Sequence, residues 1–251
     1  MSTFSADALT VVVSPTRAEM GQRAGAHAAH IIEQALQQHG EARIILASAP
    51  SQNETLTALM AAPIDWHRVT IFHMDEYLGL PEHHPQTFRA YQRAHVLPHA
   101  HGATFYGIAG DAADHAAECA RYNRLLTEAP IHLCCLGIGE NGHLAFNDPP
   151  VADFADHALV KVVELDALCR QQQVNDGCFA TIGEVPTHAL TLTIPALMSA
   201  ETLVCSVPGP RKAAAVRATV RGPIETACPA SVMRRHSAAV LYLDAESAAQ
   251  L

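Results

Sequence analysis

One segment, residues 133–150, constrains this chain more than any other part of its sequence. It continues a buried apolar run at residues 131–136, which is typical of a strand in a parallel sheet. Three glycines follow where this strand should end, and polar side chains crowd behind them. The glycines are Gly137, Gly139 and Gly142, and the polar residues are Glu140, Asn141, His143, Asn147 and Asp148. Ligands of open α/β sheets bind at strand ends, and a histidine beside carboxyl and amide groups suits proton transfer, so this segment is the candidate active site.

Composition narrows the class of protein. The chain has 251 residues, 49% of them apolar, and a formal net charge of −9. Its basic residues form no cluster beyond Arg234 and Arg235, so we expect no nucleic-acid partner. The first residues do not resemble a signal peptide and no apolar run reaches membrane-spanning length, so we expect no membrane partner. Seven scattered cysteines indicate free thiols in a reducing compartment, which favours a cytoplasmic protein. The composition is compatible with a homo-oligomer.

Strand-like and helix-like segments alternate along the chain. We predict strands at residues 9–13, 43–47, 69–72, 104–106, 131–136, 159–165, 189–194, 203–207 and 238–243. A long helix should begin after Thr16 and end before Gly40, and further helices should end near residue 60 and cover residues 88–96, 111–126 and 211–220. Asp166 should cap another. This alternation predicts one α/β domain over residues 1–251, with a mainly parallel twisted sheet and helices on both faces.

Polar clusters follow three of these strands, at residues 48–54, 75–77 and 140–148. The carboxyl ends of parallel strands meet at one edge of the sheet, so these clusters could form one site. Each also has a plainer interpretation. Asp75 and Glu76 could cap a helix, residues 48–54 could be an ordinary loop before a helix, and His143 could be a satisfied core histidine. Lys212 opens another helix and could add a positive charge or simply face solvent.

Two other interpretations fail on context. Gly137-Ile-Gly-Glu-Asn-Gly142 matches a dinucleotide fingerprint, with Glu164 and Asp166 at a suitable distance, but Pro149-Pro150 interrupts where a helix is required. Sixteen histidines suggest zinc, but none joins a cysteine or acid at a recognised ligand spacing. We therefore expect neither a nicotinamide cofactor nor a metal.

Two motifs carry a resemblance to a known family. Residues 72–81 read Phe-His-Met-Asp-Glu-Tyr-Leu-Gly-Leu-Pro, and residues 137–149 read Gly-Ile-Gly-Glu-Asn-Gly-His-Leu-Ala-Phe-Asn-Asp-Pro. In order and spacing they resemble the glucosamine-6-phosphate deaminase (isomerase) family, and the similarity runs from about residue 11 to residue 243. The related 6-phosphogluconolactonases share the fold, but His-Leu-Ala-Phe-Asn resembles the deaminase branch.

The resemblance implies a Rossmann-like fold and an aldose–ketose isomerisation of an amino sugar phosphate, coupled to loss of ammonia, without a cofactor. Asp75 matches the family's general base, and His143 matches the residue that opens the sugar ring. Asn141 and Asp148 fall where two acids orient this histidine, and Lys212 matches a phosphate-binding lysine. The other predicted substrate-binding residues are Ser48, Ser51, Gln52, Glu76, Gly139 and Arg170.

The chain departs from the family pattern beside His143 and around the phosphate. Asn141 replaces an acid, and Asp148 is one methylene shorter than the usual Glu. The family's Thr-Gly-Gly-Thr loop is replaced by residues 47–54, where Pro50 removes an N–H donor and Glu54 would repel a phosphate if it faced the site. The phosphate-binding arginine has no clear counterpart, and Arg170 lies in that region.

Three functions therefore stand side by side. The leading one is an amino-sugar-phosphate deaminase/isomerase acting on glucosamine 6-phosphate or a close relative. The altered loop favours, as a second, a related phosphosugar isomerase or lactonase acting on another sugar. The third is a non-catalytic sugar-binding domain, as in sugar-responsive regulators of this fold. Because such regulators carry a DNA-binding segment and the first predicted strand begins near residue 9, this third function ranks last.

Overall fold

The computed structural model describes residues 2–251, and an eight-stranded sheet forms its centre. The strand order is β1-β2-β11-β10-β7-β3-β4-β6, and every neighbouring pair is parallel except β1 and β2. The strands are β1 Ser2–Ala6, β2 Leu9–Val13, β3 Ala42–Leu46, β4 Val69–His73, β6 Thr104–Tyr106, β7 Leu133–Leu136, β10 Thr202–Val207 and β11 Ala239–Leu243. The predicted α/β fold with a mainly parallel sheet is confirmed. Strand β1 was missed by the sequence analysis.

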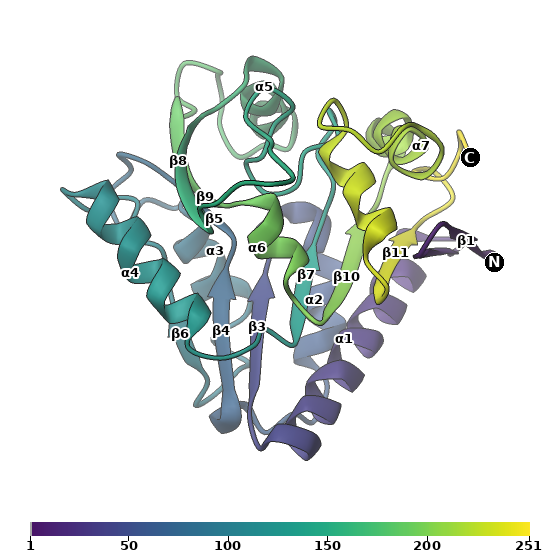
Figure 1. Cartoon of the computed structure of the whole chain (residues 1–251), viewed down its shortest axis with the longest axis horizontal. Helices are drawn as coiled ribbons and strands as arrows, with labels where there is room; N and C mark the ends of the chain where they lie inside the picture. The colour runs from purple at the N-terminus through teal and green to yellow at the C-terminus, as the bar shows by residue number, and fades with distance from the viewer. Residues whose placement is uncertain (1) are drawn as a thin grey trace.

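A second sheet of three antiparallel strands lies above the carboxyl end of the first (Figure 1). It consists of β5 Asp75–Tyr77, β8 Val160–Glu164 and β9 His188–Leu192. The sequence predicted β8 and β9 as strands but did not separate them from the parallel sheet. Part of β8 is solvent-facing, since Val162 is exposed while Val160 and Val163 are buried, and antiparallel sheets tolerate one such face.

Helices cover both faces of the large sheet, as predicted. Side chains of a strand alternate between faces, so Leu133 and Cys135 of β7 join one core while Cys134 and Leu136 join the other. The first core is shared with α1 Arg17–His39 and α2 Asn53–Met60, and the second with α4 His115–Thr127, α6 Ile194–Met198 and α7 Ala213–Arg221. The remaining helices are α3 Phe88–His95, α5 Ala167–Asn175 and four short 3-10 helices, η1 Pro50–Gln52, η2 Trp66–Arg68, η3 Pro210–Lys212 and η4 Pro229–Arg235.

Helix ends follow the local signals in the sequence. The Thr16 hydroxyl accepts a hydrogen bond from the Glu19 amide at the start of α1, and Gly40 ends that helix with a φ of 82°. Asp166 caps α5 through the Leu168 amide. The helix predicted at residues 111–126 begins later, because Asp114 caps α4 by accepting from the Ala117 amide. Among residues 2–251, no helix is long and apolar enough to cross a membrane.

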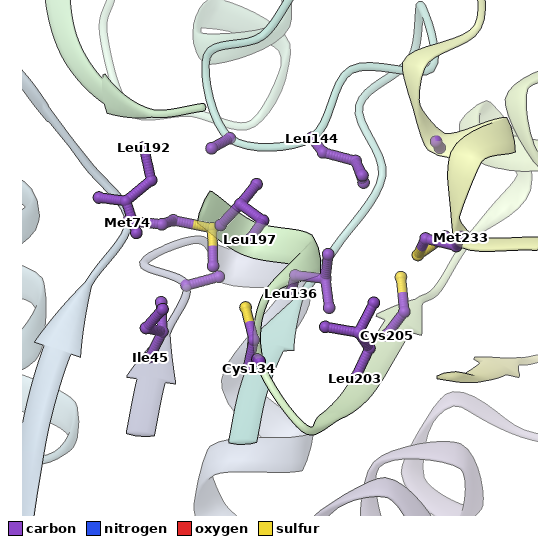
Figure 2. Close-up of a cluster of buried hydrophobic side chains, with 14 of the residues drawn as sticks. Ile45, Met74, Cys134, Leu136, Leu144, Leu192, Leu197, Leu203, Cys205 and Met233 are labelled. Atoms are coloured by element: carbon purple, nitrogen blue, oxygen red, sulfur yellow. The ribbon is translucent and has the colours of Figure 1, made fainter. Parts of the chain in front are cut away.

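The small sheet is anchored to the large one through a shared core. Met74, between β4 and β5, lies close to Leu192 of β9 and Leu197 of α6, and all three are buried (Figure 2). The same core continues to Ile45 of β3 and Leu136 of β7. This packing fixes the small sheet, and with it Asp75, relative to the carboxyl ends of the parallel strands.

Candidate active site

A pocket opens at the carboxyl ends of the parallel strands, on the side toward which the arrows of β3, β4, β7 and β10 point in Figure 1. The loops after β3, β7 and β10 contribute to its lining, and so does β5 directly after β4. The predicted site residues that line it are Ser48, Ser51, Gln52, Asp75, Gly139, His143 and Lys212. The structure therefore brings together the three polar clusters that the sequence placed after separate strands.

The loop after β3 is held from two sides. The Gln92 side chain of α3 donates to the Ser48 hydroxyl over 2.9 Å, and the buried Gln52 amide donates to the Ser206 carbonyl over 3.1 Å. The Gln52 side chain thus serves mainly to fasten the loop to the end of β10. Glu54 does not line the pocket, because it pairs with Arg17 at 2.8 Å. The repulsion of a phosphate that its sequence position suggested is therefore not built into the site.

The glycine-rich segment after β7 folds back on itself to deliver His143. The Gly139 amide donates to the His143 carbonyl and the Gly142 amide to the Gly139 carbonyl, each over 3.0 Å. Gly142 has a φ of 86°, which glycine adopts without strain. A Cβ on Gly139 would lie 2.2 Å from Cε1 of His143, so only glycine lets the imidazole lie against this turn. The ring is largely buried and lines the pocket.

Asn141 and Asp148 lie behind His143 rather than in the pocket lining. Oδ1 of Asp148 is 2.9 Å from Nδ1 of His143 and accepts a hydrogen bond from the Asn141 amide, also over 2.9 Å. Asn141 Oδ1 in turn accepts from the His143 backbone amide. Burial raises the pKa of Asp148, but the hydrogen bond and charge of His143, with Asn141 and Cys169, outweigh burial and lower it below its ordinary value. The carboxylate therefore stays ionised beside the imidazole, as an orienting partner for it.

Asp75 and Glu76 are adjacent in sequence but serve different parts of the molecule. Successive side chains of a strand point to opposite faces, so Asp75 lines the pocket and Glu76 does not. Burial, and then the charge of Glu76, raise the pKa of Asp75 well above its usual range. Glu76 is fully buried and its carboxylate accepts from the amides of Phe88 and Arg89, which begin α3. It was predicted to bind substrate, but in the structure it caps a helix.

Lys212 supplies the positive charge of the pocket. Its side chain is buried, and burial lowers its pKa from the ordinary value although the charges of Asp176 and Glu140 act in the opposite direction. It is the only cationic residue among the described residues that line the pocket. Arg211, its neighbour, is half-exposed and is held at the rim by Asp176 at 2.7 Å and Glu140 at 3.3 Å.

Arg170 lies outside this pocket. Its guanidinium donates to the backbone carbonyls of Ile182 and Val185 and so fastens the loop that precedes β9. The pocket is closed on this side by residues that the sequence analysis did not single out, namely Gln172, Gln173, Asp176 and Cys178. A signal for them exists: positions 169, 172, 173 and 176 have the i, i+3, i+4, i+7 spacing of one helix face, and Arg170 is off that face.

Two groups of side chains in residues 2–251 have the composition of a metal site. His143, Asp148 and Cys169 lie together, but Asn141 directs an amide N–H at the same Asp148 oxygen that faces His143, which opposes a cation there. His39, His132 and Glu201 lie at the opposite end of the sheet. Nδ1 of His132 accepts the Arg43 amide, so the neutral ring carries its proton on Nε2 and has no free lone pair for a metal.

Comparison with known proteins gives the family. A family model described as glucosamine-6-phosphate isomerases/6-phosphogluconolactonase matches residues 15–242. The chain belongs to this family. The resemblance seen in the two motifs is thereby confirmed, and so is the prediction of an enzyme related to glucosamine-6-phosphate deaminases.

Relatives at the sequence level are deaminases by name. A glucosamine-6-phosphate deaminase of Listeria welshimeri is 35% identical over 213 residues, which cover 84% of this chain and 89% of that protein. A glucosamine-6-phosphate deaminase of Lactobacillus delbrueckii subsp. bulgaricus is 30% identical over 243 residues, which cover 97% of this chain and all of that protein.

Solved structures of this family match over nearly the whole chain. A monomeric glucosamine-6-phosphate deaminase superposes with a TM-score of 0.88 at 28% identity, covering 96% of this chain and 99% of that one. A 6-phosphogluconolactonase of Shewanella baltica superposes with a TM-score of 0.77 at 17% identity, covering 93% and 97%. The lactonase likeness concerns the fold alone.

Proposed function

We propose that the protein is an amino-sugar-phosphate deaminase/isomerase, which converts glucosamine 6-phosphate or a close relative to the ketose phosphate and ammonia. The observation that carries this proposal is that Asp75 and His143 line one pocket whose wall also contains the buried cation Lys212. A base, an acid and an anion-binding group are what an aldose–ketose proton transfer on a phosphorylated sugar requires. The names of the relatives at 30–35% identity support the same substrate class.

Each residue then has a role in the reaction. His143, oriented by Asp148, gives a proton to the ring oxygen as the C1–O bond of the pyranose breaks and the C1 hydroxyl releases its proton to water. Asp75 takes the proton from C2 of the open chain and returns it to C1, while the C1 oxygen gains the proton that the C2 ammonium loses, so that C1 becomes an alcohol and C2 an iminium. Water adds to this iminium and ammonia leaves, so that one water is consumed and the ketose phosphate is formed. Lys212 binds the phosphate, and the Ser48 and Ser51 hydroxyls add polar contacts.

A related isomerase or lactonase acting on a different sugar is the second candidate, because Lys212 is the one buried cation in the described pocket lining and Arg170 lies outside it. Asp176 also lines the pocket, so its negative charge offsets part of the positive charge of Lys212. A different group at the far end of the sugar would suit such a site.

The experiment is ammonia release from glucosamine 6-phosphate, with galactosamine 6-phosphate and unphosphorylated glucosamine in parallel and 6-phosphogluconolactone hydrolysis measured beside them. We expect ammonia from a phosphorylated amino sugar, and its loss in Asp75→Asn with the fold retained. Asp65→Asn, which changes an exposed aspartate far from the pocket, is the matched control. Lactone hydrolysis without ammonia would favour the second candidate, and full deaminase activity of Asp75→Asn would overturn the assigned role of the base.

A further inference from the structure

Gln173 has a polar side chain in the pocket that the proposed chemistry does not use. It lies on the face of α5 that closes the pocket, and the residue is only 8% exposed. Its side-chain amide neither donates nor accepts a hydrogen bond within residues 2–251, yet neither amide atom is sealed off from the pocket. The neighbouring Gln172, in contrast, accepts from the Glu140 amide over 2.8 Å and donates to Asp176 over 3.4 Å. A buried amide without a partner is costly, so the Gln173 amide needs a partner from the pocket.

The three residues with a role in the proposed chemistry have the same combination of burial and an unpaired polar end. Asp75, His143 and Lys212 line the pocket and are each at most 8% exposed. The carboxylate of Asp75, Nε2 of His143 and Nζ of Lys212 make no hydrogen bond or ion pair with any residue that the structure describes. In the proposed function the substrate supplies their partners. Gln173 belongs to the same set by burial and by its unpaired amide, so we expect it to contact the substrate too.

The direction of α5 determines which part of a sugar phosphate Gln173 faces. In the first turn of this helix, Sγ of Cys169 lies within 4.8 Å of a ring nitrogen of His143. At the other end, Asp176 lines the pocket and pairs at 2.7 Å with the residue that precedes Lys212. The helix therefore runs alongside the pocket from the imidazole that opens the ring to the cation that binds the phosphate. Gln173 lies about one turn from each of these ends on the same helix face, which places it opposite the middle of the sugar.

We propose that Gln173 is a specificity-determining residue, which binds a hydroxyl group in the middle of the sugar, at C3 or C4. A carboxamide has an acceptor oxygen beside an N–H donor, and a hydroxyl group also donates and accepts, so the two groups match. The amide is uncharged, which suits a hydroxyl better than the phosphate that Lys212 binds. Because a helix holds the amide in one position, it distinguishes sugars by the direction of this hydroxyl. This inference rests on the proposed function and adds to it a contact away from the reacting carbons C1 and C2.

Kinetics of two matched variants test the contact. Gln173→Met removes the amide but keeps the length of the side chain and a residue that favours helix. It should raise KM for glucosamine 6-phosphate about 10-fold with little change in kcat, because the lost hydrogen bond is present in the ground state and the transition state alike. Gln171→Met makes the same substitution at an exposed position of α5 and should leave both constants unchanged. An unchanged KM in Gln173→Met, or a loss confined to kcat, overturns the proposal.

Calorimetric titration with an unreactive ligand tests the hydrogen bond without turnover. The ligand is the alditol of glucosamine 6-phosphate, which has no carbonyl at C1, together with its 3-deoxy and 4-deoxy forms. The unmodified protein should bind one of the deoxy forms about 10-fold more weakly than the parent alditol, and this form identifies the hydroxyl. In Gln173→Met the same two ligands should bind equally, because the partner of that hydroxyl is gone.

The outcomes separate this inference from the proposed function. Equal weakening of all three ligands in Gln173→Met would indicate a purely structural role and overturn the inference, even if the protein is an active deaminase. A protein that shows the expected coupling between Gln173 and one hydroxyl but releases no ammonia would contradict the proposed function alone.

Discussion

Asp75 is under two opposing demands. As a base it must be ionised, yet burial and the neighbouring Glu76 favour its neutral form and raise its pKa. Between the ordinary pKa of an aspartate and this raised value, the folded protein binds more protons than the unfolded chain. The free energy of unfolding contributed by Asp75 therefore falls as pH rises through that range.

Asp75→Asn should accordingly be more stable than the unmodified protein at neutral pH, by roughly 1–2 kcal/mol, while it loses activity. The gain should shrink as pH falls toward the ordinary pKa of aspartate, because the wild-type carboxyl is then neutral in both states. Urea unfolding at several pH values measures this, with Asp65→Asn as the exposed control. A variant less stable than the parent at neutral pH would contradict the expectation.

At the residue scale, the sequence predicts which site residues lie at strand ends, but it does not predict which side chains of a helix face the pocket. Asp75, His143 and Lys212 follow strands, and the pocket contains all three. Arg170 was predicted because it lies in the region of the family's phosphate-binding arginine, but one step along a helix turns a side chain by about 100°, which directs Arg170 away from the face that closes the pocket. Glu76 was chosen as Asp75's neighbour, although strand alternation sends it to the other side.

At the scale of elements, α1 and α2 meet through glycines of α1. A Cβ on Gly25 would lie 2.5 Å from Cβ of Ala58, 2.6 Å from the Thr55 carbonyl oxygen and 2.8 Å from the Leu59 amide. By helix propensity alone, alanine at this position would stabilise α1 by about 1 kcal/mol. Two of the three close atoms are backbone, however, so α2 itself would have to move, and overpacking of this kind costs more than the propensity gain.

Gly25→Ala should therefore lower the free energy of unfolding by about 2 kcal/mol and, because α2 follows the loop of Ser48 and Gln52, raise KM. Adding Ala58→Gly should not restore stability, since the backbone contacts remain. Chemical denaturation and steady-state kinetics of the single and double variants measure both effects. Full rescue by Ala58→Gly would show that the side-chain contact, not the helix backbone, limits the packing.

Most elements could be predicted from the sequence, but their division between two sheets could not. Residues 159–165 and 189–194 have the β-branched and alternating pattern of strands, and they form β8 and β9. Which sheet a strand joins depends on long-range pairing, here with the three residues of β5, which are too short to carry a pattern of their own. The antiparallel strand β1 was missed because its residues Ser2–Ala6 include one large apolar side chain, Phe4, and so have no clear strand pattern.

At the scale of the whole molecule, His73 joins β4 to the segment after β6. Its Nε2 accepts the Ile108 amide over 2.7 Å, and burial, followed by the charges of Arg89 and Arg121, lowers its pKa to about 3 from 6.5. Between these values the unfolded chain binds the extra proton, so the protein loses stability as pH falls from about 6.5 toward 3.

We expect His73 to account for up to about 3 kcal/mol of the stability lost between pH 7 and pH 4. His73→Gln, whose amide oxygen can still accept from Ile108, should be less stable at pH 7 but show a shallower decline in acid. His101→Gln changes an exposed histidine and serves as control. Unfolding free energies across this pH range measure the slope, and an unchanged slope in His73→Gln would contradict the expectation.

The strand order has a consequence for how activity is acquired when the chain folds. β7, which leads into the His143 turn, pairs with β3 some 90 residues earlier and with β10 about 70 residues later. Such distant pairings form late and slowly, whereas α1 and the other helices can form locally. Helical content should therefore return early in a refolding experiment. Catalysis should return only in the slowest phase, when β7 pairs with β3 and β10 at the centre of the sheet. The recovery of activity would then report the last step of folding.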